Sequence, residues 1–158
     1  MASLPVLPII VPALTGMLLL LLWKFRQAQR VVSILGGIAL AGVSGLMLSE
    51  VLARGILFYD MGGWPAPFGI TLVADAFSAG LVAITAFVAL AVAVYALAGI
   101  DEARETFGFH PLFHFLLMGI NGAFITGDLF NMYVWFEVLL IASFVLLILG
   151  NERRQLDG

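Results

Sequence analysis

Long apolar segments alternate with short polar ones along the whole chain. Five segments are dominated by apolar residues, and most approach the roughly 20 residues that an α-helix needs to cross a bilayer. They cover residues 4–23, 31–53, 72–97, 111–126 and 129–149. Backbone polar groups find no water in a bilayer core, so we expect these segments to be helical. The pattern predicts an all-α membrane protein with five transmembrane helices in a single membrane domain, residues 1–158.

The polar segments differ from one another in character. Residues 55–70 contain Gly62-Gly63 and Pro65-Ala66-Pro67, which are strong turn signals, and several aromatic residues of the kind found at a headgroup boundary. A short hairpin is a candidate structure there. Residues 99–110 (GIDEARETFGFH) are rich in charge and are predicted to be a solvated loop.

The basic residues predict an orientation in the membrane. Residues 24–30 carry Lys24, Arg26 and Arg30 and no acid, and the segment after the fifth span carries Arg153 and Arg154. Both segments should be cytoplasmic by the positive-inside rule, which places the N-terminus outside and the C-terminus in the cytoplasm. The positive charges follow the first apolar segment, whereas a secretory signal has them before it, so we expect a retained helix.

Composition supports the membrane class and excludes others. The 158 residues are 63% hydrophobic and 11% charged, with a net charge of −3 and no cysteine. A soluble domain of this length cannot bury so much apolar surface. The small net charge gives no sign of a nucleic-acid partner, and the lack of cysteine removes disulfides and thiolate metal sites. A single intramembrane histidine is a poor case for haem, so no cofactor or metal is expected.

Glu137 is the most informative residue of the chain. It interrupts the last apolar segment, between FNMYVWF and VLLIASFVLLILG, and no nearby residue can neutralise it. A carboxylate at mid-bilayer costs roughly 2.5–3.5 kcal/mol on insertion scales, and such residues are usually functional. We therefore predict that Glu137 belongs to an ion or proton pathway. The alternative is a core glutamate that hydrogen-bonds a neighbouring helix for packing.

Three further polar residues are predicted to belong to the same ion or proton pathway. If the last two spans pair as an antiparallel hairpin, Glu137 lies level with Met118. His114 and Asn121, seven residues apart on one face, then flank it by roughly 5–6 Å on either side. His114 is either a proton-relay residue or a hydrogen-bonded packing residue. Tyr133, one turn from Glu137, is placed to hydrogen-bond it.

Two acids near span ends have open roles. Asp75 opens the third span, where it is either a pathway residue or an acid favoured by the helix dipole. Glu50 and Arg54 are four residues apart near the end of the second span, and a structural ion pair is expected, with a role in the charge path as the alternative.

A family resemblance rests on two stretches. They are GGWPAPFGITLVADAFSAGLV from Gly62 and FHPLFHFLLMGINGAFITGDLFNMYVWFEVLLIASFVLLILG from Phe109. Both closely resemble the D subunits of the multisubunit Mrp-type sodium/proton antiporters. More broadly, they resemble the antiporter-like, proton-pumping subunits of respiratory complex I and membrane-bound hydrogenases. GDLFNMYVWFEVLLIAS is specific for the branch formed by the D subunits, whereas the first two spans are generic.

The resemblance implies a larger fold and assigns roles. Such proteins have about fourteen helices with two inverted five-helix repeats. It implies that Glu137 is essential for ion transport and pairs with a lysine on a seventh helix, beyond this chain, and that Asp75 corresponds to an acid of the family. At His114 the family commonly has glutamine, so a relay role for His114 is supported only by its predicted depth in the membrane. We expect an N-terminal fragment, a truncated reading frame or one half of a split subunit.

The predicted function is that of a transporter subunit, not an enzyme. The expected partners are other subunits of a membrane antiporter complex, the missing C-terminal half or a downstream chain, the lipid bilayer, protons, and Na⁺ or another monovalent cation. The expected location is the bacterial inner membrane. One alternative is a proton-pumping subunit of a complex I-like NADH-quinone oxidoreductase or membrane-bound hydrogenase. A second alternative is a structural assembly subunit without transport.

Overall fold

The computed structural model describes residues 3–149, and this part of the chain is a bundle of long helices. The long helices are α1 (Leu7–Leu21), α2 (Arg26–Arg54), α3 (Ala76–Gly99), α5 (Phe109–Ile125) and α6 (Leu129–Leu147). The short elements are η1 (Leu4–Val6), β1 (Leu57–Asp60), η2 (Met61–Gly63), β2 (Thr71–Ala74) and α4 (Glu102–Thr106). Arg153 and Arg154 lie outside the described residues.

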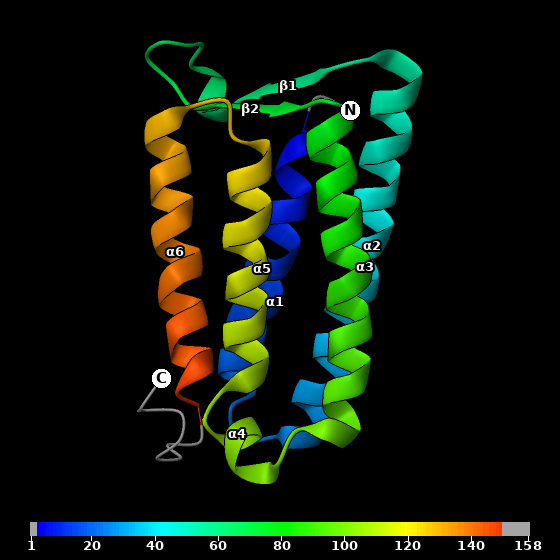
Figure 1. The fold of residues 1–158 in the computed structure, drawn as a ribbon, viewed down its shortest axis with the longest axis vertical. Helices are drawn as coiled ribbons and strands as arrows, with labels where there is room; N and C mark the ends of the chain where they lie inside the picture. The colour runs from blue at the N-terminus through cyan, green and yellow to red at the C-terminus, as the bar shows by residue number, and fades with distance from the viewer. Residues whose placement is uncertain (1–2, 150–158) are drawn as a thin grey trace.

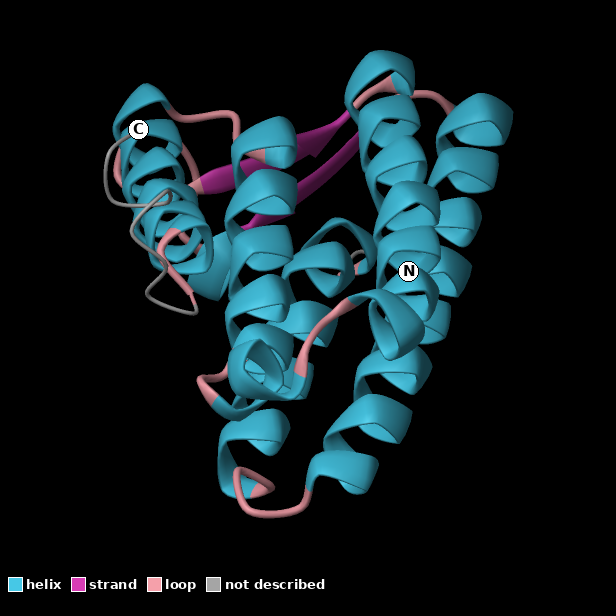
Figure 2. Cartoon of the chain, turned by 60° about the horizontal axis from the view of Figure 1, so that its bottom comes forward, coloured by secondary structure: helices cyan, strands magenta, loops and turns pink. Residues whose placement is uncertain are grey.

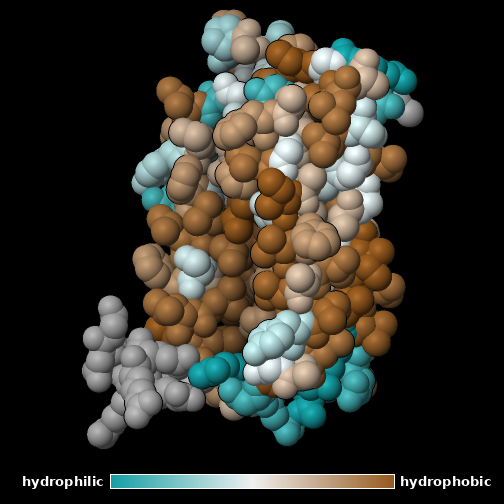
Figure 3. All heavy atoms as spheres, turned by 45° about the vertical axis from the view of Figure 1, so that its right-hand side comes forward, coloured by the Kyte–Doolittle hydropathy of each residue, from teal (hydrophilic) through white to brown (hydrophobic). Residues whose placement is uncertain are grey.

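The predicted all-α membrane fold is confirmed. Within residues 3–149, four helical stretches are long and apolar enough to cross a membrane: Leu4–Leu21, Arg26–Arg54, Ala76–Gly99 and Leu129–Leu147. The helix Phe109–Ile125 is apolar but shorter. On the face drawn in Figure 3, hydrophobic residues dominate the middle of the molecule and hydrophilic residues gather toward its two ends.

The helices run side by side between two different ends (Figure 1). α5 is central, because it packs against α1 on one side and α6 on another, while α2 packs against α3 and α1. The β-strands lie across one end of the bundle and α4 lies at the other (Figures 1 and 2). We call these the hairpin end and the α4 end. α6 is therefore an outer helix that packs mainly on α5.

The candidate hairpin in residues 55–70 is present. β1 pairs antiparallel with β2, with Leu57 opposite Ala74 and Asp60 opposite Thr71. The connection turns at Gly62 and Gly63, whose φ values of 66° and 75° are left-handed conformations that glycine adopts without a Cβ clash. The second strand, Thr71–Ala74, lies beyond residues 55–70 and occupies the start of the predicted third span, so helix α3 begins only at Ala76 and not at residue 72.

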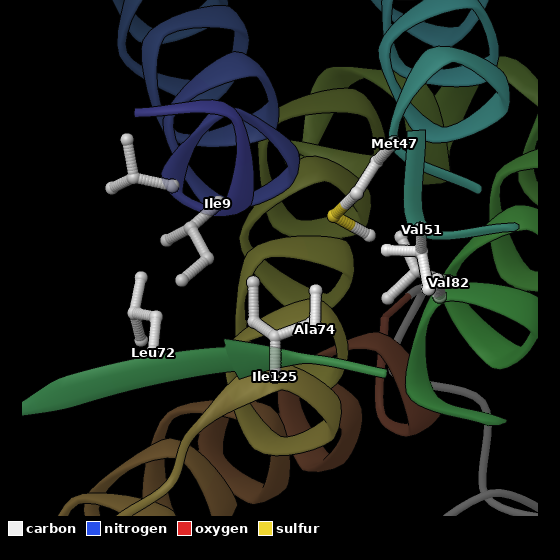
Figure 4. Close-up of a cluster of buried hydrophobic side chains, with 9 residues drawn as sticks. Ile9, Met47, Val51, Leu72, Ala74, Val82 and Ile125 are labelled. Carbon is white, nitrogen blue, oxygen red and sulfur yellow. The ribbon is translucent and has the colours of Figure 1, made fainter. Parts of the chain in front are cut away.

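The hydrophobic core at the hairpin end joins the strands to the helices. Ile9, Met47, Val82 and Ile125 come together from four helices, and Leu72 of β2 lies against them with Ala74 and Val51 (Figure 4). The buried positions of α3 that continue toward the α4 end are almost all alanine (Ala79, Ala86, Ala89, Ala93 and Ala96). Small side chains let two helix backbones approach closely, which explains the tight α2–α3 pair.

Candidate functional site

Glu137 lies at the middle of α6, and the sequence sets that position. Asp128 caps the helix, since its Oδ1 accepts a hydrogen bond from the Asn131 backbone N–H at 2.6 Å. This cap fixes the start of α6 one residue later. The helix that follows contains no glycine or proline and continues to Leu147, so the Glu137 carboxylate lies well away from both helix ends.

The inner face of α6 is fixed by close packing on α5. A Cβ atom at Gly119 would lie 2.9 Å from Leu139, and one at Gly122 would overlap the indole ring of Trp135. The two glycines therefore form the surface on which Trp135 and Leu139 pack. This contact turns the opposite side of α6, with Glu137, away from the bundle.

The outer face of α6 exposes Glu137 among apolar side chains. Tyr133 and Ile141, one turn to either side, are 61% and 63% exposed, and Glu137 itself is exposed. The Tyr133 side chain lies one turn from Glu137, and the two side chains interact electrostatically. Among residues 3–149, no basic side chain forms an ion pair with Glu137. The described structure thus holds an unpaired acid on a surface that is otherwise apolar.

His114 and Asn121 do not flank Glu137, and this part of the prediction is wrong. Both side chains are completely buried. Ring Nε2 of His114 lies 3.1 Å from Ser33 Oγ of α2, and Asn121 Nδ2 donates to the carbonyl of Pro8 in α1 at 2.9 Å. At 100° per residue, these side chains lie roughly a quarter turn or more around α5 from the glycines that face α6. The rise per residue determines the level of a side chain along the helix, but it does not determine which neighbouring helix that side chain faces.

Asp75 caps helix α3. Its Oδ1 accepts a hydrogen bond from the Ser78 backbone N–H at 2.7 Å, and Ser78 Oγ accepts one from the Asp75 backbone N–H at 3.0 Å. This capping box satisfies two amides that the helix cannot pair internally. The bond from the Ser78 amide lowers the pKa of Asp75 below its ordinary value. The geometry accounts for Asp75 as a helix-start residue at the hairpin end.

Glu50 and Arg54 lie at the hairpin end of α2. Arg54 Nε lies 2.8 Å from Glu50 Oε2, across one helical turn. The Arg54 side chain is 62% exposed, so water screens this pair strongly.

A second polar cluster, which the sequence reasoning missed, lies at the α4 end. Residues 99–110 are not simply a solvated loop, because Glu102–Thr106 form α4 and Glu105 is only 2% exposed. Arg30 donates from Nε and Nη2 to the two Glu105 oxygens at 2.7 and 2.9 Å, while Arg26 Nε lies 3.5 Å away. Ring Nε2 of His110 lies 3.4 Å from the same carboxylate.

The charge of Glu105 is balanced within this cluster. Burial would raise the pKa of Glu105, but the hydrogen bonds from Arg30 and His110 outweigh it and lower the pKa. The sequence carried one signal for this contact. The basic residues 24–30 were expected in the cytoplasm, and alternation of the predicted spans puts the acidic residues 101–105 on the same side, so their pairing could have been inferred. Within residues 3–149, no three histidine or acidic side chains meet closely enough to hold a metal ion.

The chain is similar to antiporter subunits. It is 42% identical over 156 residues to the D subunit of the Na(+)/H(+) antiporter of Alkalihalophilus pseudofirmus, covering 99% of this chain and 32% of that protein. It is 46% identical over 118 residues to the D subunit of the probable K(+)/H(+) antiporter of Rhizobium meliloti, covering 75% of this chain and 20% of that protein. No protein-family model matches the chain. The chain thus spans about one third of the length of the first of these relatives.

Two solved structures share the fold. The Mrp complex from Dietzia sp. matches with a TM-score of 0.80 at 25% identity, covering 93% of this chain and 27% of that one. The membrane-bound sulfane sulfur reductase, an archaeal respiratory membrane complex, matches with a TM-score of 0.92 at 21% identity, covering 98% of this chain and 32% of that one. Together with the sequence relatives, these matches confirm the resemblance to the D subunits of Mrp-type antiporters.

Proposed function

We propose that this chain is part of the D subunit of an antiporter and that the complete protein exchanges a monovalent cation for protons across the bacterial inner membrane. In this proposal the described segment contributes Glu137 to the ion path. The observation that carries it is the position of Glu137: a carboxylate at mid-helix, exposed on an apolar face and without an ion pair among residues 3–149. Intramembrane acids in such positions are usually functional.

The chemistry that suits this position is switchable pairing. A carboxylate in apolar surroundings takes up a proton, whereas one beside an ammonium group stays ionised. The family resemblance implies a lysine partner from a helix outside this chain. When the lysine approaches, Glu137 releases its proton, and when the lysine moves away or is neutralised, Glu137 takes one up. Tyr133, which already interacts with the carboxylate, is placed to hold its orientation in both states.

The orientation in the membrane is part of the proposal. The α4 end, where Lys24, Arg26 and Arg30 lie beside α4, faces the cytoplasm, and the hairpin end faces outside. The test is labelling of single cysteines with an impermeant reagent in intact cells. A cysteine at Arg26 should stay unlabelled from outside, and one at Gly63 should be labelled. The reverse pattern overturns the orientation.

A redox-driven proton pump is the alternative that shares this fold. The fold does not separate the two functions, because the respiratory complex and the Mrp complex both match it. The sequence relatives favour the antiporter, because those at 42% and 46% identity are antiporter subunits. Proton movement driven by an imposed cation gradient, without an electron donor, supports antiport. Proton movement that requires quinone or sulfur reduction supports the pump.

The decisive experiment is substitution of Glu137 in the complete protein, assembled with its partner subunits in vesicles. Glu137→Gln keeps the size and hydrogen bonding but removes the charge, so assembly should survive and cation-driven proton flux should be lost. Glu137→Asp should keep partial flux. Glu50→Gln is a matched control, since it removes an acid at the end of α2 and should leave flux near native. Native flux in an assembled Glu137→Gln complex would make Glu137 a packing residue and favour the structural-subunit alternative.

A further inference from the structure

We propose that helix α1 is hinged between Pro8 and Pro12, that Asn121 of α5 closes this hinge, and that transport uses bending there. The role in transport rests on the proposed function, whereas the hinge itself does not. We call Pro8, Pro12 and Asn121 the α1 hinge.

The backbone of α1 lacks one of its regular hydrogen bonds. Pro12 lies inside the helix and has no backbone N–H, so the Pro8 carbonyl loses the donor that an α-helix supplies four residues later. Asn121 replaces that donor, since its Nδ2 donates to the Pro8 carbonyl at 2.9 Å. A carbonyl oxygen only accepts, so the amide nitrogen of Asn121, and not its oxygen, must face it. One side chain of α5 therefore completes the backbone of α1.

Water cannot take the place of Asn121 at this position. Pro8 and Asn121 are fully buried, and Pro12 is buried as well. A buried carbonyl without a hydrogen bond is strongly unfavourable, above all inside a bilayer. The Oδ1 of Asn121 itself has no hydrogen-bond partner among the described residues. An apolar side chain would avoid that cost, so the carbonyl that the amide serves explains why an asparagine stands here.

The α1 hinge lies between two hydrophobic clusters. The cluster at the hairpin end contains Ile9 of α1 and Ile125 of α5 (Figure 4). The cluster nearer the α4 end contains Leu117 of α5, and Val11 of α1 packs against it. Helix α1 thus passes from one cluster to the other between Ile9 and Val11, within the stretch that the two prolines bound.

Polar residues occupy the layer between these clusters. Ser44 is the buried residue of α2 between Leu40, which belongs to one cluster, and Met47, which belongs to the other. Its Oγ is buried without a hydrogen-bond partner in the described part of the chain. Asn121 holds the corresponding place on α5. Regions with few buried apolar contacts open most easily, so bending of the bundle is easiest in this layer.

The α1 hinge lies at the depth of Glu137. The two glycines of α5 that face α6 stand on either side of Asn121 in the sequence, and their partners Trp135 and Leu139 stand on either side of Glu137. Paired residues of antiparallel helices are level, so Asn121 and Glu137 lie at one depth although Asn121 faces α1. A transporter must open its ion site to each side of the membrane in turn. Bending at this depth moves the hairpin-end part of α1 relative to the α4-end part.

The first test is a double-mutant cycle on the complete protein, purified in detergent. Asn121→Ala leaves the Pro8 carbonyl unpaired, so the equilibrium constant for unfolding should rise roughly tenfold or more. In a Pro12→Ala background the new backbone N–H serves that carbonyl, and the same substitution should raise the constant far less. Pro111→Ala, in the first turn of α5, restores no donor to Pro8 and is the control background. Equal effects of Asn121→Ala in all three backgrounds overturn the α1 hinge.

The second test is hydrogen exchange, which measures whether the two parts of α1 open separately. In Asn121→Ala, amides of residues 4–11 should exchange faster, because the hairpin-end part of α1 is released. Amides of residues 109–117, nearer the α4 end, should exchange as in the native protein. Equal acceleration in both segments would show one continuous core and would overturn the α1 hinge.

The third test is cation-driven proton flux through the complete protein, assembled with its partner subunits in vesicles. Pro12→Ala restores the backbone bond and stiffens α1, so stability should be native or higher while part of the flux is lost. Pro111→Ala should keep native flux. Native flux per assembled Pro12→Ala complex overturns the role of the α1 hinge in transport, and loss of flux in Glu137→Gln then still supports the proposed function. The reverse pair of results rejects the role of Glu137 and keeps the hinge.

Discussion

Glu105 and Glu137 are two acids of one chain in opposite situations. Glu105 is buried at the α4 end, where Arg30, Arg26 and His110 surround its carboxylate. Glu137 is exposed on the outer face of α6, and Tyr133 is its one described polar neighbour that interacts with it. The first acid was expected in a solvated loop and the second was expected at the centre of a polar site. In the structure, Glu105 lies in the buried polar cluster, whereas Glu137 lies on an exposed apolar face.

The comparison distinguishes an acid whose charge is neutralised by partners within this chain from an acid that has no such partner among the described residues. The side chains that contact the Glu105 carboxylate, Arg30 and His110, come from α2 and α5, so the packing of the helices neutralises its charge. Glu137 interrupts an apolar surface that the described helices do not cover. An unpaired intramembrane carboxylate is unfavourable, so its partners should come from outside the described residues. The next four predictions test this contrast, from the largest effect to the smallest.

The largest effect is expected from removing the main partner of Glu105. Arg30→Ala deletes its two shortest hydrogen bonds, and removing one partner of a buried carboxylate is strongly destabilising because its charge is then poorly compensated. Arg54→Ala is the control, since its exposed pair with Glu50 is worth only about 0–1 kcal/mol. The measurement is the free energy of unfolding of the purified protein in detergent. Equal losses in the two variants would mean that Glu105 is solvated and that the contrast with Glu137 is wrong.

A smaller loss is expected at the contact that turns Glu137 outward. Gly122→Ala places a methyl group against the Trp135 ring, and overpacking of this kind costs typically about 1–3 kcal/mol. Gly45→Ala is a matched control, because a Cβ atom there meets nothing within 4 Å. Alanine is the better helix former by roughly 0.5–1 kcal/mol, so the control should be neutral or stabilising. A Gly122→Ala protein as stable as the control would contradict the described α5–α6 contact.

A third prediction distinguishes the two roles of Asp75. Asp75→Ala removes the helix cap and should cost about 1 kcal/mol, whereas Asp75→Asn keeps a capping acceptor and should cost less. Because the folded pKa of Asp75 is lowered, its contribution is fully present above the unfolded pKa and is lost as pH falls through the folded value. Unfolding measured from pH 7 downward should show a larger loss in the native protein than in Asp75→Ala, which keeps the loss due to the lowered pKa of Glu105. If Asp75→Asn abolishes ion flux with native stability, the pathway role holds instead.

The smallest effect on stability is expected at Glu137. Because its carboxylate makes no ion pair among residues 3–149, Glu137→Gln should change the free energy of unfolding by no more than about 0.5 kcal/mol. The same variant should abolish flux in the complete protein. A large loss of stability in this variant, comparable with that of Arg30→Ala, would show that Glu137 stabilises the fold and would remove the contrast between the two acids.

The sequence alone determined the fold class and the local signals. The apolar segments predicted the membrane helices, the paired glycines and prolines indicated the hairpin, and the motif around Glu137 indicated the relatives of the chain. Asp75 followed by Ser78 already carried a helix-start signal, because capping is a contact between residues three apart. Such features depend on neighbours in sequence, or on total apolar content, so they can be read without tertiary structure.

Only the tertiary structure decided which side each polar residue faces. Periodicity put His114 and Asn121 on one face of α5, but the contacts of Gly119 and Gly122 with α6 turned that face toward α1 and α2. The partner of Glu105 is 75 residues earlier in the chain. In a helix that is apolar on nearly every side, hydropathy does not indicate which stripe packs inward. The choice is made by close approach at small residues and by pairing of buried charges, and both depend on residues distant in sequence.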